Sequence, residues 1–176
     1  TIAHVLSQEA AKPIDYASGE VERASQTFSF AADELIAARG DVIPLDAAAK
    51  GAGLWGLTRR FPVGSVLAIT PFNFPLNLVA HKVAPAIAAG CPIVVKPANK
   101  TPLTALLLAE IVLEAGWPPE ALSVINVALE DAPRLVRDER FDLLTFTGSD
   151  RVGWRLKSQA GRKRCLLELG GDAAVI

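Results

Sequence analysis

Four apolar runs in this sequence each end at a side chain or turn that could do chemistry. Asn73 lies in the turn PFNFP, Lys96 opens KPAN, residues 146–149 form FTGS, and Glu168 precedes two glycines in ELGG. An amide can stabilise an oxyanion, and a lysine can bind a phosphate. A glycine-containing turn at a helix start can bind an anion, and a carboxylate can act as a base. If the four runs are neighbouring parallel strands, these groups share one edge of a sheet.

Asn73 and Lys96 each have a functional and a structural interpretation. Asn73 lies between prolines that restrict the backbone, and its amide could stabilise a developing oxyanion by roughly 3–4 kcal/mol. It could instead satisfy its own backbone in an Asx turn. Lys96 ends an apolar run, where it could reach a ribose or phosphate, or extend along the surface with its charge in water.

The other two turns also have two interpretations. The N–H groups of the FTGS turn would suit a pyrophosphate, but a helix start needs no ligand. The GxGxxG fingerprint of dinucleotide sites is absent from the sequence. Glu168 stands among leucines, so we expect a poorly solvated carboxylate that could serve as a general base near neutral pH. The alternative is a structural carboxylate that accepts hydrogen bonds from turn N–H groups.

The cysteines and histidines are not predicted to do chemistry. Cys91 lies at the end of a predicted helix, where the dipole disfavours a thiolate, and Cys165 lies inside an apolar run. His4 and His81 have no second ligand at a metal-binding spacing. We therefore predict no metal site.

The elements that would position these groups alternate between strand and helix from Phe61 onward. Residues 64–70 and 92–95 are predicted strands, and 76–89 a helix that ends at Gly90, so this β-α-β unit has parallel strands. Further helices are predicted at 102–115 (with Thr101 as N-cap), 131–136 and 150–160, and further strands at 123–127, 142–146, 164–169 and from 173 onward. We predict an α/β fold, an open parallel Rossmann-like sheet with helices on both faces, plus a protruding two-stranded ribbon.

The residues before Phe61 form two further parts. A short helix before Pro13 and a long helix over about 15–38 are predicted to make a helical part over residues 1–40, as scaffold. Residues 41–46 and 54–60 are predicted strands of the ribbon, which would be marginal alone. It could rest on its own domain or on a partner subunit. Residues 61–176 would form the α/β domain.

Composition argues against several classes of protein. The 176 residues are 51% hydrophobic with a net charge of −1, which gives no reason to expect nucleic-acid binding. No apolar run reaches the roughly 18 residues that span a membrane. Nothing resembles a signal peptide or disulfide framework, so we expect a cytoplasmic location. Because the sequence starts at Thr1, contains no methionine and stops within an apolar run, we expect a segment of a longer protein.

Taken together, the motifs resemble those of the aldehyde dehydrogenase superfamily. The similar stretches are ITPFNFPLNLVAHKVAPAIAAGCPIVVKPANKTPLTA, FDLLTFTGSDRVGW and LELGGDAAVI, in the order and spacing of the family. The resemblance implies oxidation of an aldehyde to a carboxylic acid through a cysteine thiohemiacetal and thioester, with NAD or NADP as coenzyme. It also implies that residues 41–60 are an oligomerisation ribbon, and that the protein is a homodimer or homotetramer.

The resemblance also implies roles for individual residues. Asn73 would donate to the oxyanion, Glu168 would activate water for deacylation, and Lys82 matches a family lysine on the helix after PFNFP. Lys96 would hold the adenosine ribose. The other residues on the implied coenzyme path are Thr70, Pro71, Phe72, Ala98, Asn99, Gly148, Ser149, Val152, Leu169 and Gly170.

Three departures from the family qualify this interpretation. The family's catalytic cysteine lies further beyond the ELGG glutamate than this chain extends, so we expect the segment alone to be inactive. Asn99 replaces a glutamate of many NAD-preferring members, which makes NADP use a hypothesis. Residues 128–134 lack glycines that members often carry. Two alternatives remain: a reductase of acyl phosphates or acyl-CoA in the same superfamily, and a non-catalytic cofactor-binding or assembly module.

Overall fold

A five-stranded parallel sheet forms the centre of the computed structural model, which describes residues 1–172 and 174. The strands run in the order β5-β4-β3-β6-β7. They are β3 (Val66–Ile69), β4 (Ile93–Lys96), β5 (Leu122–Val124), β6 (Leu143–Gly148) and β7 (Arg164–Leu169). From β3 the chain moves to one edge through β4 and β5, and then returns to the other side of β3 for β6 and β7. The order therefore reverses between β3 and β6, which is where ligands bind in open α/β sheets.

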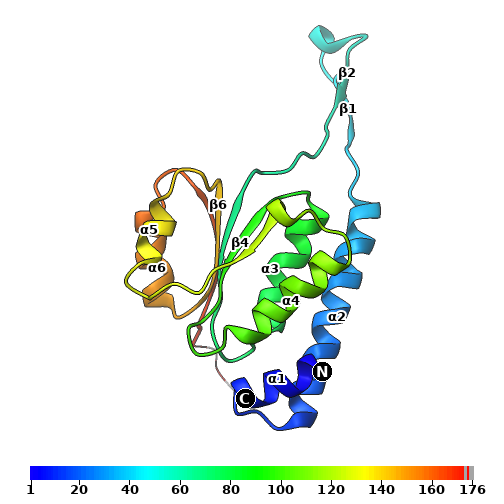
Figure 1. The fold of residues 1–176 in the computed structure, drawn as a ribbon. Helices are drawn as coiled ribbons and strands as arrows, with labels where there is room; N and C mark the ends of the chain where they lie inside the picture. The colour runs from blue at the N-terminus through cyan, green and yellow to red at the C-terminus, as the bar shows by residue number, and fades with distance from the viewer. Residues whose placement is uncertain (173, 175–176) are drawn as a thin grey trace.

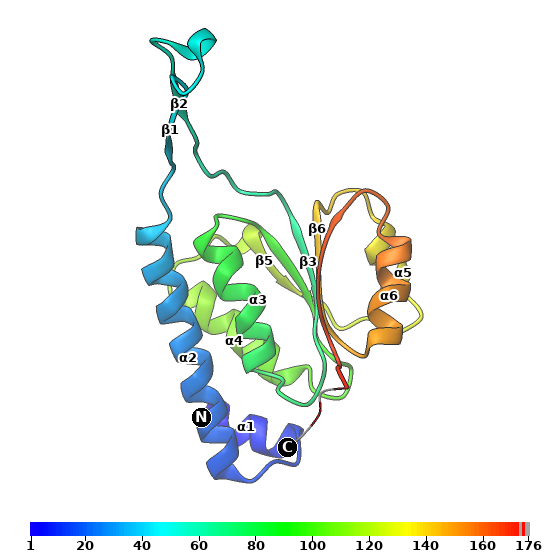
Figure 2. The same cartoon turned by 180° about the vertical axis from the view of Figure 1, so that it is seen from behind.

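Helices cover both faces of this sheet (Figures 1 and 2). One face carries α3 (Asn77–Ala88) and α4 (Leu103–Glu114), on which α2 (Ile14–Ala37) and α1 (Ile2–Glu9) pack; the other carries α5 (Ala132–Arg137) and α6 (Asp150–Gln159). Strand β3 serves both faces, because Val66 and Ala68 join the first core and Leu67 and Ile69 the second. A strand buried on both sides has no polar alternation, and this explains its continuous apolar sequence. The predicted fold class is confirmed.

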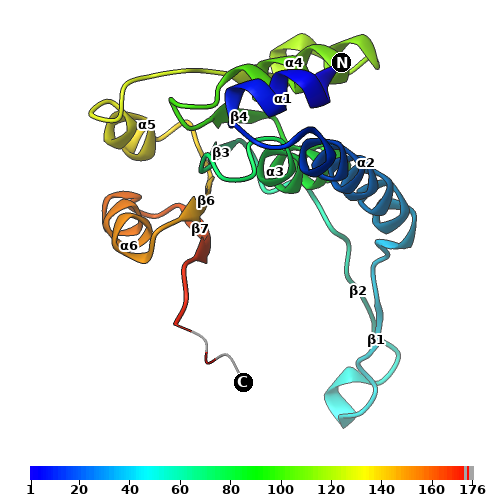
Figure 3. The ribbon, with the colours of Figure 1, turned by 90° about the horizontal axis from the view of Figure 1, so that it is seen from below.

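The ribbon projects away from the body of the domain (Figures 1 and 3). Strands β1 (Val42–Pro44) and β2 (Trp55–Leu57) pair antiparallel, and the 3-10 helix η1 (Ala49–Gly51) lies at its tip. Trp55 is 81% exposed and Leu57 76% exposed. These large apolar side chains have no cover in the part of the chain that the structure describes.

Element boundaries differ from the sequence predictions in ways that packing explains. Gly90 follows α3 with φ +67°, as a C′ glycine should, and its N–H bonds to the Ile87 carbonyl. The prediction of Thr101 as N-cap is wrong, because α4 starts after Pro102 and Glu9 of the neighbouring α1 accepts hydrogen bonds from its first N–H groups. Strand β6 runs on through Gly148, since its whole length pairs with β7. The strand predicted from 173 onward lies outside the described residues.

One further short element, the 3-10 helix η2 (Pro119–Ala121), leads directly into β5. No helix among residues 1–172 and 174 is long and apolar enough to cross a membrane.

Candidate functional site

Strand pairing brings the four predicted turns to one edge of the sheet. Ile69, just before the PFNFP turn, pairs with Lys96 on one side and with Phe146 on the other. Glu168 pairs with Thr147 on the next strand. The side chains singled out in the sequence thus lie on neighbouring strands at the carboxyl end of the sheet, where β3 and β6 form the topological switch point.

Lys82 and Glu168 meet at this edge, although they are far apart in the sequence. The Lys82 Nζ lies 3.6 Å from Glu168 Oε1 and donates to Thr145 Oγ1 at 3.0 Å. The Thr147 hydroxyl donates to Glu168 Oε2 at 2.6 Å. Burial lowers the pKa of Lys82, and the nearby Glu168 carboxylate opposes that shift. The result is a hydrogen-bonded cluster in which the lysine is buried and one carboxylate is held by two partners.

The expectation that Glu168 is desolvated by leucines is wrong. Its side chain is 55% exposed, whereas that of Lys82 is 1% exposed. The difference arises because β7 is the last strand on its side of the sheet that residues 1–172 form, and its side chains alternate between exposed and half-buried. Within the described part of this chain, Lys82 and Thr147 therefore orient the Glu168 carboxylate, and no apolar shell surrounds it.

Lys96 is a buried side chain and not a surface lysine. It is 2% exposed, and its ammonium donates to the Pro97 carbonyl at 3.0 Å and to Asn99 Oδ1 at 2.8 Å. Asn99 in turn donates to the Val127 carbonyl at 2.9 Å. Burial lowers the pKa of Lys96. The lysine is thus fixed at the end of β4, with Asn99 tying it to the segment after β5.

The glycines around the start of α6 are required by close packing. A Cβ on Gly148 would lie 2.5 Å from the Phe146 ring, and one on Gly153 would lie 2.4 Å from Leu169. The Gly170 N–H donates to the Gly148 carbonyl at 3.2 Å. Ser149 is the N-cap of α6 and makes no capping hydrogen bond through its side chain. Val152 packs in the second core.

The segment after β3 holds the remaining predicted residues. Thr70 is 5% exposed, and its hydroxyl has no hydrogen-bond partner among the described residues. Phe72 is 55% exposed, with the Lys100 ammonium 5.4 Å from its ring. Pro71 and Ala98 are half-buried, one on each of these neighbouring strand ends. Across residues 1–172 and 174, the Asn73 amide makes no hydrogen bond, so the geometry does not favour the Asx-turn interpretation.

Sequence reasoning missed the two residues that hold the Asn73 loop. Lys12 donates to the Asn73 carbonyl at 2.8 Å and to Glu20 Oε2 at 2.6 Å. Glu20 is 2% exposed, and its other oxygen accepts the Leu76 and Asn77 N–H groups at 2.9 and 3.0 Å. A carboxylate from α2 therefore caps the N-terminus of α3. The sequence did carry a signal, since Glu20 lies between Ala17 and Ala24 on a helical stripe that is otherwise apolar.

We expect the Lys12→Met variant to loosen this loop locally. Removing the ammonium leaves the buried Glu20 with its backbone donors alone, at a cost of about 2 kcal/mol. Amide exchange at Leu76 and Asn77, measured by hydrogen–deuterium exchange, should then be roughly 30-fold faster. The exposed Lys50 in the ribbon provides a matched control, Lys50→Met. Equal exchange in both variants would show that the Lys12–Glu20 pair does not hold the loop.

The two cysteines are placed as structural residues. Cys91 is 1% exposed, and burial raises the pKa of Cys165. Within the described ranges, no three His, Cys, Asp or Glu side chains are grouped to hold a metal ion.

Comparison with known proteins agrees with this geometry. The sequence matches the aldehyde dehydrogenase family over residues 1–176. It is 43% identical to 3-sulfolactaldehyde dehydrogenase of Priestia aryabhattai, over 99% of this chain and 37% of that protein. The crystal structure of aldehyde dehydrogenase 21 from Physcomitrella patens, in complex with the reaction product succinate, superimposes with a TM-score of 0.94 at 53% identity. That match covers 98% of this chain and 36% of the other.

A second similar solved structure contains a bound coenzyme. Glyceraldehyde-3-phosphate dehydrogenase from Methanocaldococcus jannaschii, complexed with NADP, superimposes with a TM-score of 0.86 at 42% identity, over 97% of this chain and 37% of that one. The chain thus spans little more than a third of the length of these relatives. The match nevertheless extends from the first residue to the last. The chain belongs to the aldehyde dehydrogenase family.

Proposed function

We propose that the full-length protein oxidises an aldehyde to a carboxylic acid with NAD or NADP, and that this chain supplies the coenzyme site, the oxyanion donor and the general base. The observation that carries the proposal is the cluster of Lys82, Glu168 and Thr147 at the same sheet edge as the buried Lys96. The nucleophilic cysteine would come from a part of the protein outside this chain. An assay of reduced coenzyme formed by the full-length protein from an aldehyde tests the proposal, and absence of that product would contradict it.

The residues at this edge fit a dinucleotide. The Lys96 ammonium lies where a ribose or phosphate would meet the end of β4, and the buried Thr70 hydroxyl lacks a partner among the described residues. Gly148 allows β6 to turn closely into α6, whose N-cap residue Ser149 makes no side-chain capping hydrogen bond. The Asp150 carboxylate accepts the Arg151 N–H at 2.6 Å, so a pyrophosphate would bind to the other N–H groups of this turn. Leu169, the last residue of β7, and Gly170 lie beside this turn. When bound, the coenzyme accepts the hydride of the aldehyde.

The protein groups would divide the remaining work. Asn73 would donate its amide to the oxygen that becomes negative when the thiol adds to the aldehyde. Glu168 would accept a proton from the water that attacks the thioester, which releases the acid and frees the thiol. Thr147 holds one oxygen of that carboxylate, and Lys82 supports the other with its charge. Lys82 is therefore assigned a positioning role.

Asn99 leads to a prediction about coenzyme choice. Its side chain is neutral and already bonded to Lys96, so a 2′-phosphate would meet a lysine without a competing carboxylate. In the full-length enzyme, Asn99→Glu should lower the ratio of kcat/KM for NADP to that for NAD by about tenfold, equivalent to ~1.4 kcal/mol. Asn99→Gln is the matched control, because it keeps a neutral amide. An unaltered ratio in the glutamate variant would refute this assignment.

Most of the relatives are named for an aldehyde that carries a second, anionic group, whereas one from Methanocaldococcus jannaschii is named for the neutral lactaldehyde. The substrates or products of the three compared above are 3-sulfolactaldehyde, succinate and glyceraldehyde-3-phosphate, which bear a sulfonate, a carboxylate and a phosphate. The anionic groups differ, but each of these three compounds carries at least one in addition to the aldehyde or the carboxylate formed from it. We therefore propose an anionic aldehyde as the substrate class.

Two other functions can be separated from this one by experiment. A reductase of acyl phosphates or acyl-CoA would not need Glu168 for turnover, because phosphate or a thiol takes the place of water. A non-catalytic cofactor-binding module would have no nucleophilic cysteine in the rest of the protein. The exposed Trp55 and Leu57 support the proposal that the ribbon contacts another subunit of a homodimer or homotetramer.

A further inference from the structure

We propose that Lys12 and Glu20 are positioning residues for the oxyanion donor Asn73, and that the rate of thiol addition to the aldehyde depends on their ion pair. This inference rests on the proposed aldehyde oxidation. Neither side chain is assigned a contact with the aldehyde or the coenzyme. Both act through the loop that carries Asn73.

The loop of Asn73 has few contacts of its own to fix its position. The Asn73 amide makes no hydrogen bond among the described residues, and the flanking Pro71 and Pro75 have no N–H group to anchor the backbone. An oxyanion donor is effective only when it lies about 2.7–3.1 Å from the position that the negative oxygen will occupy. The position of this amide must therefore be set by groups outside the loop.

The Lys12 ammonium provides contacts to two consecutive residues of the loop. It donates to the Asn73 carbonyl at 2.8 Å and lies 4.3 Å from the centre of the Phe74 ring. It also donates to Glu20 Oε2 at 2.6 Å, and its side chain is 17% exposed. Solvent screens such a partly buried pair only weakly. Because one fixed ammonium contacts both residues, it restricts the position and the orientation of the backbone that bears the Asn73 side chain.

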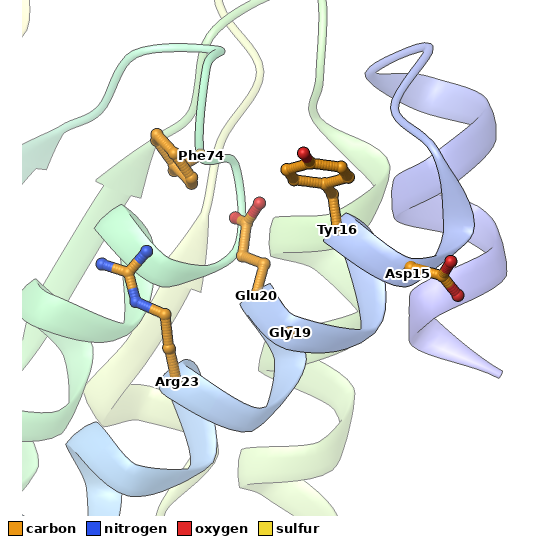
Figure 4. Close-up of a pocket in the computed structure, with 6 residues that line it drawn as sticks. All are labelled: Asp15, Tyr16, Gly19, Glu20, Arg23 and Phe74. Carbon is orange, nitrogen blue, oxygen red and sulfur yellow. The ribbon is translucent and has the colours of Figure 1, made fainter.

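Glu20 fixes the other end of the same loop. Its Oε1 accepts the N–H groups of Leu76 and Asn77 at 2.9 and 3.0 Å. Figure 4 shows its side chain on α2, pointing into the space between Phe74 and Tyr16. Hydrogen bonds that involve a charged group are about twice as strong as neutral ones. The chain from Asn73 to Asn77 is therefore held at both ends by one buried ion pair.

The corner between α1 and α2 holds Lys12 in a strained backbone. Ala11 has φ +49°, a left-handed conformation that residues other than glycine rarely adopt. The Lys12 N–H donates to the Ser7 carbonyl at 3.0 Å, and the Ser7 hydroxyl donates to the Lys12 carbonyl at 2.6 Å. Strain of this kind persists where surrounding contacts enforce it, and it recurs at sites with a functional role. The corner thus supports a precise placement of the ammonium.

A double-mutant cycle in the full-length enzyme tests this role, with succinate semialdehyde and whichever of NAD and NADP is reduced faster. Lys12→Met should slow the first burst of reduced coenzyme by about 10- to 100-fold, because a small displacement of a reacting group has effects of this size. In an Asn73→Ala background the same substitution should change the burst by less than about twofold, since no amide remains to be positioned. A purely structural role would slow the burst equally in both backgrounds.

Glu20→Gln provides a second measurement that leaves Lys12 in place. A glutamine has one carbonyl oxygen and one NH₂ group, so an N–H donor would face either Lys12 or the first N–H groups of α3. This variant should slow the burst and should depend on Asn73 in the same way. Glu22→Gln, at an exposed position on the same helix, is the matched control and should leave the burst unchanged. Coenzyme affinity equal to that of the wild type would show that each variant is folded.

The outcomes separate this inference from the proposed function. Equal slowing in the two backgrounds, or an unchanged burst in both Lys12→Met and Glu20→Gln, would overturn the positioning role and leave aldehyde oxidation standing. A wild-type protein that forms no reduced coenzyme from succinate semialdehyde or from butanal would overturn both proposals.

Discussion

Replacing Glu168 with glutamine should lower the turnover number of the full-length enzyme by about 10²- to 10⁴-fold. Glutamine keeps the shape of the side chain and can still accept a hydrogen bond from Thr147, but it cannot take a proton from water. The thioester would therefore form and then persist. Rapid mixing should still show a first burst of reduced coenzyme, followed by a slow steady state.

The burst separates a deacylation base from a residue needed for folding. Glu139→Gln is the matched control, because Glu139 is exposed and precedes β6 at the opposite end of the sheet. It should leave both phases unchanged. If Glu168→Gln turned over at the wild-type rate, the assignment of the base would be wrong, and the acyl-phosphate or acyl-CoA reductase would become the better interpretation.

Replacing Asn73 with alanine should reduce the rate of the first chemical step by about 10²- to 10³-fold, the usual effect of losing one oxyanion donor. Lys12 holds the backbone carbonyl of Asn73 and not its side chain, so alanine leaves the loop's own hydrogen bond in place. The effect should therefore fall on the burst itself. This distinguishes Asn73→Ala from Glu168→Gln, in which the burst survives.

Rapid-mixing traces of the two variants, recorded with the same aldehyde and coenzyme, measure this difference. A normal burst in Asn73→Ala would contradict the oxyanion assignment. Amide exchange at Leu76 and Asn77 provides the structural control, because these N–H groups bond to Glu20 and should keep their protection in the alanine variant.

The fold could be predicted because its signals are local. The apolar run of β3, the glycine after α3 and the regular alternation of strand and helix each follow from a few adjacent residues. Parallel strands then place their carboxyl ends together whatever their order, so the sheet edge that holds Asn73, Lys96 and Glu168 was predictable as well.

The errors and omissions arise from contacts between distant residues. The exposure of Glu168 depends on β7 being the last strand on its side of the described sheet, and local sequence does not specify strand order. The loop of Asn73 depends on Lys12 and Glu20, which belong to the N-terminal part of the chain. The start of α4 was misplaced because Glu9 of α1 binds its N–H groups in place of Thr101.

The most direct test of the central claim is the balance of products in a single turnover of the full-length protein. With enzyme in excess over an anionic aldehyde, and with NADP or NAD present, each aldehyde consumed should yield one reduced coenzyme and one carboxylic acid. Neither phosphate nor coenzyme A should be required. Aldehyde consumption without reduced coenzyme, or acid formation only after an acyl phosphate or acyl-CoA is hydrolysed, would contradict the account.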